Sequence, residues 1–346
     1  MAAAPASAPL PFSVDGKTAI VTGAGSGINL EFARLLLSRN CNVVFADLAL
    51  RPEAQALVDE HSSADPPAAA RALFVKTDVT AWPELRQLFA ATLAAFGDFD
   101  VLCPGAGVYE PLWSNFWHPP GCSPASRDDA DAGRYKLLDI NVTHPIRATQ
   151  LALSLWLHPP PPPSPSASDD DANGSAADLQ KTPVKASPLN PKRVVHISSV
   201  AGQVPNFNAP LYAASKFAVS GFVRSMAPLE PTAGVRVNAV APGLIKTPLW
   251  TEHPEKLAFV DDARDGWATP EEVAHAMLKC VEDPALVGGS VLEVGKENTR
   301  VVGVFDDPGP DRDPRKGLCA SNSANGTKEI WGWLADEAVW GWKEKL

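Results

Sequence analysis

Short apolar and β-branched runs alternate along the chain with stretches whose apolar residues recur at helical spacing. The runs predict strands over residues 18–22, 42–46, 72–77, 99–103, 193–198, 235–240 and 290–294. The stretches between them predict helices over residues 30–37, 54–60, 85–96, 135–157 and 209–226 and from residue 271. Strands that are apolar throughout are typical of parallel sheets covered by right-handed helical crossovers. We therefore expect an α/β fold, a single doubly wound sheet of about seven parallel strands with helices on both faces.

This alternation occupies residues 15–296, which we expect to form one domain. The preceding residues, 1–14, are rich in Ala and Pro and are predicted to be flexible. Residues 158–192 pass through a proline run at 159–163 and then Ser, Asp and Ala, and cannot bury enough apolar surface to offset their ordering entropy. We expect a disordered insert there, and docking of the proline run on an aromatic groove is the less common alternative.

Residues 297–346 form a Trp-rich tail. In it Trp331, Leu334, Ala338 and Trp342 recur at helix-like spacing. Such an apolar stripe requires a surface to cover it. A substrate lid and a subunit contact both satisfy that requirement, and the sequence leaves both open.

The charge balance excludes some classes of partner. The formal net charge is -10 and the pI is about 5.2. Such a protein has little positive electrostatic potential to attract nucleic acid or anionic lipid, so we expect neither as a partner. No run of about 18 apolar residues occurs, and the first residues lack a basic segment before an apolar one. We expect a cytoplasmic protein with a neutral or weakly charged small-molecule ligand.

The cysteines are five, an odd number, and show no paired spacing. This pattern favours scattered reduced thiols over disulfides or a zinc site. No metal site is expected.

A Gly-rich turn follows the first predicted strand and precedes the first predicted helix, in the order Thr22-Gly23-Ala24-Gly25-Ser26-Gly27-Ile28-Asn29. Glycines allow positive φ and close approach of backbone N–H groups to a pyrophosphate, whose charge a helix N-terminus also favours. A purely steric turn is the alternative for such a motif in isolation. In this context we predict a Rossmann-type dinucleotide site formed by Gly23, Gly25, Ser26, Gly27 and Ile28.

The second predicted strand ends at Asp47, twenty positions after Gly27, where an adenosine ribose would lie. A carboxylate there accepts hydrogen bonds from ribose hydroxyls and repels a 2′-phosphate, which favours NAD over NADP. Arg51 lies close enough in sequence to weaken that preference, and a loop-initiating aspartate is the alternative role for Asp47. Asp78 and Val79, after the third strand, are weaker candidates for contacts with the adenine.

The segment Tyr212-Ala213-Ala214-Ser215-Lys216 places a phenol and an ammonium on one face of a predicted helix. The adjacent cation, with an oxidised nicotinamide ring, would stabilise a phenolate and allow Tyr212 to act as a general base. Ser199, thirteen residues earlier at the end of a predicted strand, offers a hydroxyl that can hold the substrate oxygen. A packed tyrosine beside a snorkelling lysine is the alternative for the pair alone.

Taken together, these motifs resemble the short-chain dehydrogenase/reductase family over residues 15–295. The details are similar to the branch that contains NAD-linked 15-hydroxyprostaglandin dehydrogenase and related fungal alcohol dehydrogenases. The resemblance implies a catalytic set of Asn141, Ser199, Tyr212 and Lys216, with Asn141 holding a water behind the lysine. It further implies cofactor contacts from Gly105, Pro242, Gly243, Ile245 and Thr247, in addition to Tyr212 and Lys216. A homodimer or homotetramer built on the helices over 135–157 and 209–226 is also implied.

Two positions depart from the family pattern. Asn29 stands in place of the third glycine of the turn and adds a side chain where helix and sheet pack closely. The family's Asn-Asn-Ala-Gly after the fourth strand reads Pro104-Gly105-Ala106-Gly107, which loses two amides. Neither change removes a catalytic group.

We therefore expect an NAD-dependent oxidoreductase that interconverts a secondary alcohol and a ketone. The tryptophans at 113, 117 and 250 and those in the tail suggest a bulky, hydrophobic substrate. A non-catalytic NAD-binding scaffold, with partners recruited by the Pro-rich insert, is one alternative. An NADP-dependent carbonyl reductase is another, and Asp47 argues against it.

Overall fold

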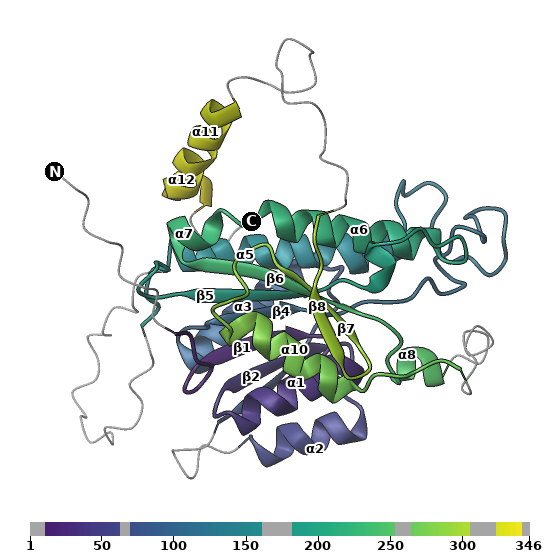
Figure 1. Cartoon of the computed structure of the whole chain (residues 1–346), viewed down its shortest axis with the longest axis horizontal. Helices are drawn as coiled ribbons and strands as arrows, with labels where there is room; N and C mark the ends of the chain where they lie inside the picture. The colour runs from purple at the N-terminus through teal and green to yellow at the C-terminus, as the bar shows by residue number, and fades with distance from the viewer. Residues whose placement is uncertain (1–10, 63–69, 161–181, 253–263, 305–322, 341–346) are drawn as a thin grey trace.

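The computed structural model describes residues 11–62, 70–160, 182–252, 264–304 and 323–340 (Figure 1). Within them, eight strands form one sheet in the order β3-β2-β1-β4-β5-β6-β7-β8. Their bounds are β1 Thr18–Thr22, β2 Asn42–Asp47, β3 Ala72–Lys76, β4 Val101–Pro104, β5 Lys192–Ile197, β6 Val235–Pro242, β7 Val291–Gly295 and β8 Asn298–Val301. All seven predicted strands occur, which confirms the doubly wound α/β fold.

The eighth strand, β8, was missing from the prediction. It pairs antiparallel with β7, whereas the other neighbouring strands pair parallel. All four of its residues are exposed, so they show none of the apolar patterning that marks a buried strand. The sheet therefore extends past residue 296, where the sequence placed the start of the tail.

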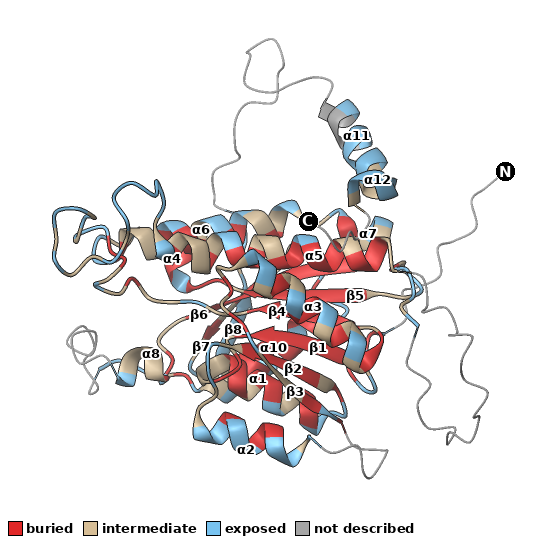
Figure 2. Ribbon diagram, turned by 180° about the vertical axis from the view of Figure 1, so that it is seen from behind, coloured by how far each residue is buried: buried red, intermediate tan, exposed pale blue. Residues whose placement is uncertain are grey.

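Helices cover both faces of the sheet. The helices α1 (Gly27–Ser38), α2 (Pro52–Glu60) and α10 (Pro270–Glu282) contribute to one apolar cluster. The helices α3 (Trp82–Phe96), α5 (His144–Leu157), α6 (Pro210–Ser225) and α7 (Leu229–Ala233) contribute to the other. Figure 2 shows the buried residues concentrated in the strands between these layers. The apolar strands are thus buried on both faces, as parallel sheets require.

The helix predicted over 135–157 is not uniform. It consists of a short α4 (Lys136–Leu138), a π-helical turn over Asp139–Thr143 and then α5. π-helical turns are rare and are often found at functional sites. This one contains Asn141, the residue that the family resemblance places in the catalytic set.

The described residues also revise the predicted termini of the domain. Phe12 and Val14, which fall in the segment predicted to be flexible, are buried, and the Val14 N–H donates to Glu282 Oε1 at 3.0 Å. The predicted insert over 158–192 ends earlier than expected, because Lys192 already belongs to β5. Residues 1–10 and 161–181, where the flexible and disordered predictions are centred, lie outside the described residues.

The tail forms α11 (Ser323–Ala335) and α12 (Glu337–Trp340). Trp331, Leu334 and Trp340 pack against the cluster that α3, α5 and α6 form. His158 Nε2 lies 2.9 Å from the Leu334 carbonyl oxygen, and Ser154 Oγ donates to the Trp340 carbonyl, so the tail contacts the carboxyl end of α5. Trp342, the last residue of the predicted stripe, lies outside the described residues. Among the helices described here, none combines the length and hydropathy needed to cross a membrane.

Lys192 is a fully buried cation at the start of β5. Its Nζ donates to Asp98 Oδ2 at 2.8 Å, to Asp100 Oδ1 at 3.0 Å and to the Phe99 carbonyl oxygen at 2.9 Å. Its three N–H donors are therefore all satisfied. Burial raises the pKa of Asp98, and the ammonium of Lys192 opposes that rise. The arrangement fixes β5 beside the loop that enters β4.

Lys192→Met should lower the free energy of unfolding by about 3–5 kcal/mol, because it leaves two carboxylates close together without their buried cation. Urea denaturation would measure the change. Arg34→Ala, which removes the exposed ion pair between Arg34 and Glu31, is the matched control and should change it by no more than ~0.5 kcal/mol. A loss for Lys192→Met as small as that of the control would contradict the role assigned to Lys192.

Candidate active site

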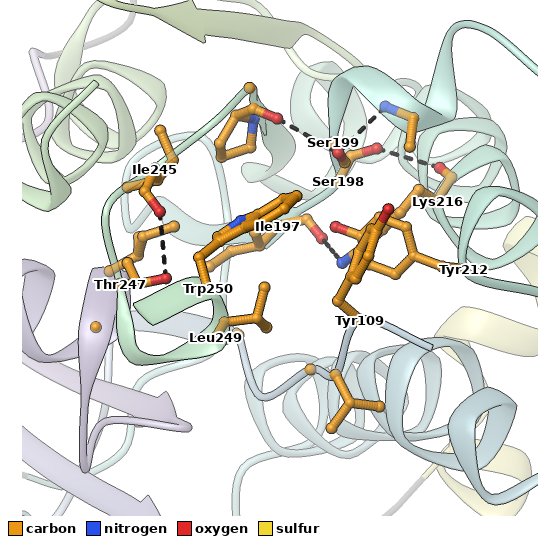
Figure 3. Close-up of a pocket in the computed structure, with 18 of the residues that line it drawn as sticks. Tyr109, Ile197, Ser198, Ser199, Tyr212, Lys216, Ile245, Thr247, Leu249 and Trp250 are labelled. Atoms are coloured by element: carbon orange, nitrogen blue, oxygen red, sulfur yellow. Dashed lines mark hydrogen bonds between the residues drawn. The ribbon is translucent and has the colours of Figure 1, made fainter. Parts of the chain in front are cut away.

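A cleft of about 320 Å³ opens at the carboxyl ends of the strands (Figure 3). This is the edge at which doubly wound sheets bind ligands, and β1 and β4 flank the point where the strand order reverses. The sequence-predicted residues that line it are Gly23, Ser26, Gly27, Ile28, Gly105, Ser199, Tyr212, Lys216, Pro242, Gly243, Ile245 and Thr247. Segments that are distant in sequence therefore meet in one cleft.

The Gly-rich turn has the backbone that the sequence predicts. Gly23 and Gly27 have φ values of 72° and 61°, and α1 begins at Gly27. A Cβ atom at Gly25 would lie 2.8 Å from Asp47 Oδ2 and 2.5 Å from the Ala49 carbonyl oxygen. The turn therefore excludes side chains and leaves backbone N–H groups at a helix N-terminus, a cradle that fits the pyrophosphate of a nicotinamide dinucleotide.

The predicted adenosine contacts lie behind the turn rather than in the cleft lining. Asp47 Oδ2 accepts from the Gly25 N–H at 2.9 Å, and Oδ1 accepts from the Leu48 N–H at 2.7 Å. Asp78 is engaged by Thr80, whose N–H and Oγ1 both donate to Oδ1, at 2.9 and 2.7 Å. Val79 is buried in the apolar cluster. Asp47 is the carboxylate of this set that contacts the Gly-rich turn directly.

Ser199, Tyr212 and Lys216 come together at the end of β5 and the first turns of α6. Ser199 Oγ accepts from the Ala201 N–H at 3.1 Å and donates to the Pro242 carbonyl oxygen at 3.3 Å. It also lies close enough to the Tyr212 hydroxyl to lower the pKa of that group. Lys216 Nζ donates to the Ile197 carbonyl oxygen at 2.8 Å. The serine and tyrosine hydroxyls thus face the same point in the cleft, with the ammonium behind them.

Burial is the main cause of the shifted pKa values of Tyr212 and Lys216. It raises the pKa of Tyr212 to about 12, against the effect of the hydrogen bond with Ser199, and Tyr109 nearby raises it further. Burial lowers the pKa of Lys216 to about 8. Burial therefore favours the neutral forms of both side chains, and the expectation that Lys216 together with an oxidised nicotinamide ring stabilises the phenolate stays a prediction.

Asn141 is buried, and its side-chain amide hydrogen-bonds to protein atoms on two segments. Its Oδ1 accepts from the Val108 N–H, and its Nδ2 donates to the Val108 carbonyl oxygen, both at 2.9 Å. The Nδ2 also donates to Ser215 Oγ at 3.2 Å. The amide thus joins the loop after β4 to α6, and the role of Asn141 in holding a water behind Lys216 stays a prediction.

Sequence reasoning missed Glu110, in the loop after β4. Its side chain is buried, and its backbone has a φ of 29°, which is costly for any residue but glycine. Its Oε2 accepts from the Tyr212 N–H at 2.8 Å, its Oε1 accepts from the Phe116 N–H at 3.1 Å, and the Leu211 N–H is a further donor. Because the residue before α6 provides no side-chain cap, Glu110 caps this helix from a distant loop.

An aromatic wall lines one side of the cleft. The rings of Tyr109 and Tyr212 are edge to face with centroids 4.6 Å apart, and Tyr109 lies 5.3 Å from Trp250. Figure 3 shows Trp250 extending into the same space as the two tyrosines. Trp117, which the sequence also associated with the substrate, is outside the cleft lining and packs on Phe207. The aromatic contribution to the cleft therefore comes mainly from Tyr109 and Trp250.

Glu110→Gln should lower the free energy of unfolding by about 1.5–3 kcal/mol, because it removes the charge from a buried acceptor of several backbone N–H groups. Chemical denaturation monitored by tryptophan fluorescence would measure this loss. The matched control is Glu271→Gln, at an exposed position in the first turn of α10, which should have little effect. Equal effects of the two substitutions would rule out Glu110 as the cap of α6.

Comparisons with known proteins agree with this geometry. Cis-4-hydroxycyclohexanecarboxylate dehydrogenase of Sinomonas cyclohexanicum is 33% identical over 291 residues, covering 82% of this chain and 97% of the relative. Human 15-hydroxyprostaglandin dehydrogenase [NAD(+)] is 28% identical, covering 81% and 91%. The short chain dehydrogenase/reductase astE of Aspergillus oryzae is 27% identical, covering 82% and 95%.

The fold has solved counterparts as well. The 3-ketoacyl-(acyl-carrier-protein) reductase of Brucella melitensis, complexed with NADH, superposes with a TM-score of 0.58 at 22% identity over 82% of this chain and 98% of that one. A model of the short chain dehydrogenase family matches residues 17–160 and 190–258, which hold the Gly-rich turn and the Ser199, Tyr212 and Lys216 group. The chain therefore belongs to the short-chain dehydrogenase/reductase family of oxidoreductases.

Proposed function

We propose that the protein is an NAD-dependent dehydrogenase that interconverts a secondary alcohol and a ketone, with Tyr212 as the proton-transfer residue. The observation that carries the proposal is the shared position of the Ser199 and Tyr212 hydroxyls in the cleft that the Gly-rich turn also lines. A ligand oxygen that meets both hydroxyls lies within reach of a dinucleotide held by the turn.

Ser199, Tyr212 and Lys216 have different roles in the proposed reaction. Ser199 orients the substrate hydroxyl by hydrogen bonding, and the proton of that hydroxyl passes to Tyr212 Oη. Lys216 contacts the Ile197 carbonyl and lies with its Nζ 5.4 Å from the centre of the Tyr212 ring, where its charge favours the phenolate. The bound dinucleotide supplies the hydride acceptor for oxidation, or the donor for reduction.

The proton affinity of Tyr212 indicates how activity should depend on pH. Because its pKa is raised to about 12, the free protein holds it protonated at neutral pH. Alcohol oxidation needs the phenolate, so its rate should rise with pH, while ketone reduction needs the phenol and should not. A cationic ligand ring beside the phenol shifts this balance towards phenolate.

The preference for NAD rests on two charged groups near the adenosine end. Asp47 contacts the Gly25 N–H and presents a carboxylate that repels a 2′-phosphate. Arg51, the nearby cation that would attract one, forms a bidentate pair with Glu252, both distances being 2.6 Å. The charge of Arg51 is thereby balanced within the protein. NAD(+) also appears in the name of the human 15-hydroxyprostaglandin dehydrogenase relative.

The lining of the cleft supports a bulky, uncharged substrate. Tyr109 and Trp250 provide flat apolar surfaces beside the reacting hydroxyls. Among the described lining residues, the side chain that carries a formal charge is Lys216, which is buried behind Tyr212. An anionic substrate would therefore find no arginine in this lining to pair with. A secondary alcohol on an aromatic or alicyclic skeleton fits best.

Tyr212→Phe should lower kcat for NAD reduction by a factor of about 10²–10⁴, because it removes the proton-transfer group and leaves the ring in place. The assay is NADH absorbance with a panel of apolar secondary alcohols, together with NADH binding by fluorescence. Tyr135→Phe, which alters a tyrosine outside the cleft lining, is the control and should retain full activity. Turnover by Tyr212→Phe at the wild-type rate would refute the proposed mechanism, and NADH binding without turnover by the wild type would favour a scaffold.

Asp47→Ser should raise kcat/KM for NADP relative to NAD by at least about tenfold, because it removes a like charge from the 2′-phosphate position. Glu252→Gln should add a smaller gain of about two- to fivefold by releasing Arg51 from an exposed ion pair. The double variant Glu252→Gln/Arg51→Gln should lose that smaller gain. An unchanged cofactor ratio in all three variants would show that neither charged group sets the preference.

A further inference from the structure

The two departures from the family pattern meet in space. Asn29, in the first turn of α1, is 8% exposed and lies against Gly105, in the loop after β4. A Cβ atom at Gly105 would lie 2.7 Å from Asn29 Cγ and 2.8 Å from Asn29 Nδ2. Real Cβ atoms do not approach other atoms this closely, so a side chain at 105 would force the buried Asn29 amide to move.

The side-chain amide of Asn29 also lies close to the Gly-rich turn. A Cβ atom at Gly23 would lie 2.9 Å from Asn29 Nδ2 and 2.8 Å from Ala106 Cα. The thiol of Cys103 is 3.9 Å from Asn29 Oδ1, at the limit of a weak hydrogen bond. Asn29 therefore fills a space enclosed by the turn after β1 and the end of β4.

We propose that Asn29 is a cofactor-positioning residue that occupies the space left by the missing side chain at position 105. The two positions share one pocket, which accepts one amide side chain and not two. Asn29 then acts as a spacer that sets the distance between the Gly-rich turn and the β4 loop. The inference rests on the proposed binding of a dinucleotide.

Three observations explain why this spacer affects cofactor affinity more than the chemical step. Gly23, Asn29 and Gly105 all line the cleft, so a change in their spacing reshapes the binding surface directly. The Ala106 N–H donates to Thr22 Oγ1 at 3.1 Å, so a second contact keeps the β4 loop attached to the end of β1 when the spacing at Asn29 changes. Asn29 has no described hydrogen bond with Ser199, Tyr212 or Lys216.

A double-mutant cycle between positions 29 and 105 tests the proposal. Dissociation constants for NADH and for NADPH are measured by fluorescence titration for the wild type, Asn29→Gly, Gly105→Asn and the double variant. KM for NAD and kcat are measured for the same four proteins. Gly221→Asn, at an exposed helical glycine where an added Cβ atom would meet no atom within 4 Å beyond the backbone of its own helix and its chain neighbours, controls for the addition of an asparagine side chain as such.

Gly105→Asn should weaken NADH binding by at least about tenfold, because two amides compete for one pocket. Asn29→Gly should weaken it by about three- to tenfold, because the turn loses its spacer. The double variant should return to within about threefold of the wild type, and the changes should appear in KM for NAD with kcat nearly constant. Gly221→Asn should leave NADH binding unchanged.

Two results would overturn the proposal: a double variant that binds NADH no better than Gly105→Asn, or a Gly105→Asn variant as tolerant as Gly221→Asn. If Gly105→Asn does not accumulate as a folded protein, recovery of folding and NADH binding in the double variant still supports it, and failure to recover them contradicts it. A wild-type protein that binds neither NADH nor NADPH would instead refute the proposed function, which separates the two failures.

Discussion

The hydrogen bonds that fasten α6 to the ends of β4 and β5 determine whether the reacting groups meet. Tyr212 and Lys216 lie on the same helix, so an error in its placement moves both. Glu110 holds the first turn of the helix from the β4 side, and Ser198 Oγ donates to the Lys216 carbonyl oxygen at 3.1 Å from the β5 side. Buried polar contacts outside the cleft are therefore as necessary to the chemistry as the residues that line it.

Desolvation makes this site responsive to the charge of its ligand. Tyr212 and Lys216 both have pKa values shifted by burial towards the neutral form. Burial also lowers the pKa of His144 to about 4 and that of His196 to about 3, and the charge of Lys216 adds to both effects. Near neutral pH the two histidines are therefore uncharged, and Lys216 and Glu110 are the charged side chains that lie against Tyr212 among the described residues. In such desolvated surroundings, the positive charge of a bound ligand would strongly stabilise the Tyr212 phenolate.

The elements were predictable from sequence because each depends on local spacing, and the Gly-rich turn, Ser199 and the Tyr212–Lys216 pair were found for the same reason. Glu110 was not, because its carboxylate caps a helix that begins a hundred residues later. The contact between Asn29 and Gly105 is equally remote in sequence, so two departures that looked independent proved to share one space. The predicted homo-oligomer and cytoplasmic location stay predictions.

The topology places the described residues on either side of the Pro-rich segment at the edge of the sheet away from the cleft. In a doubly wound sheet, loops that follow strands lie at the carboxyl edge, and loops that follow helices lie at the opposite edge. Pro160 follows the end of α5, and Thr182 precedes β5, so both residues lie at the edge away from the cleft. The tail contacts the same end of α5 through His158. Its described helices therefore lie at the end of α5 that points away from the cleft.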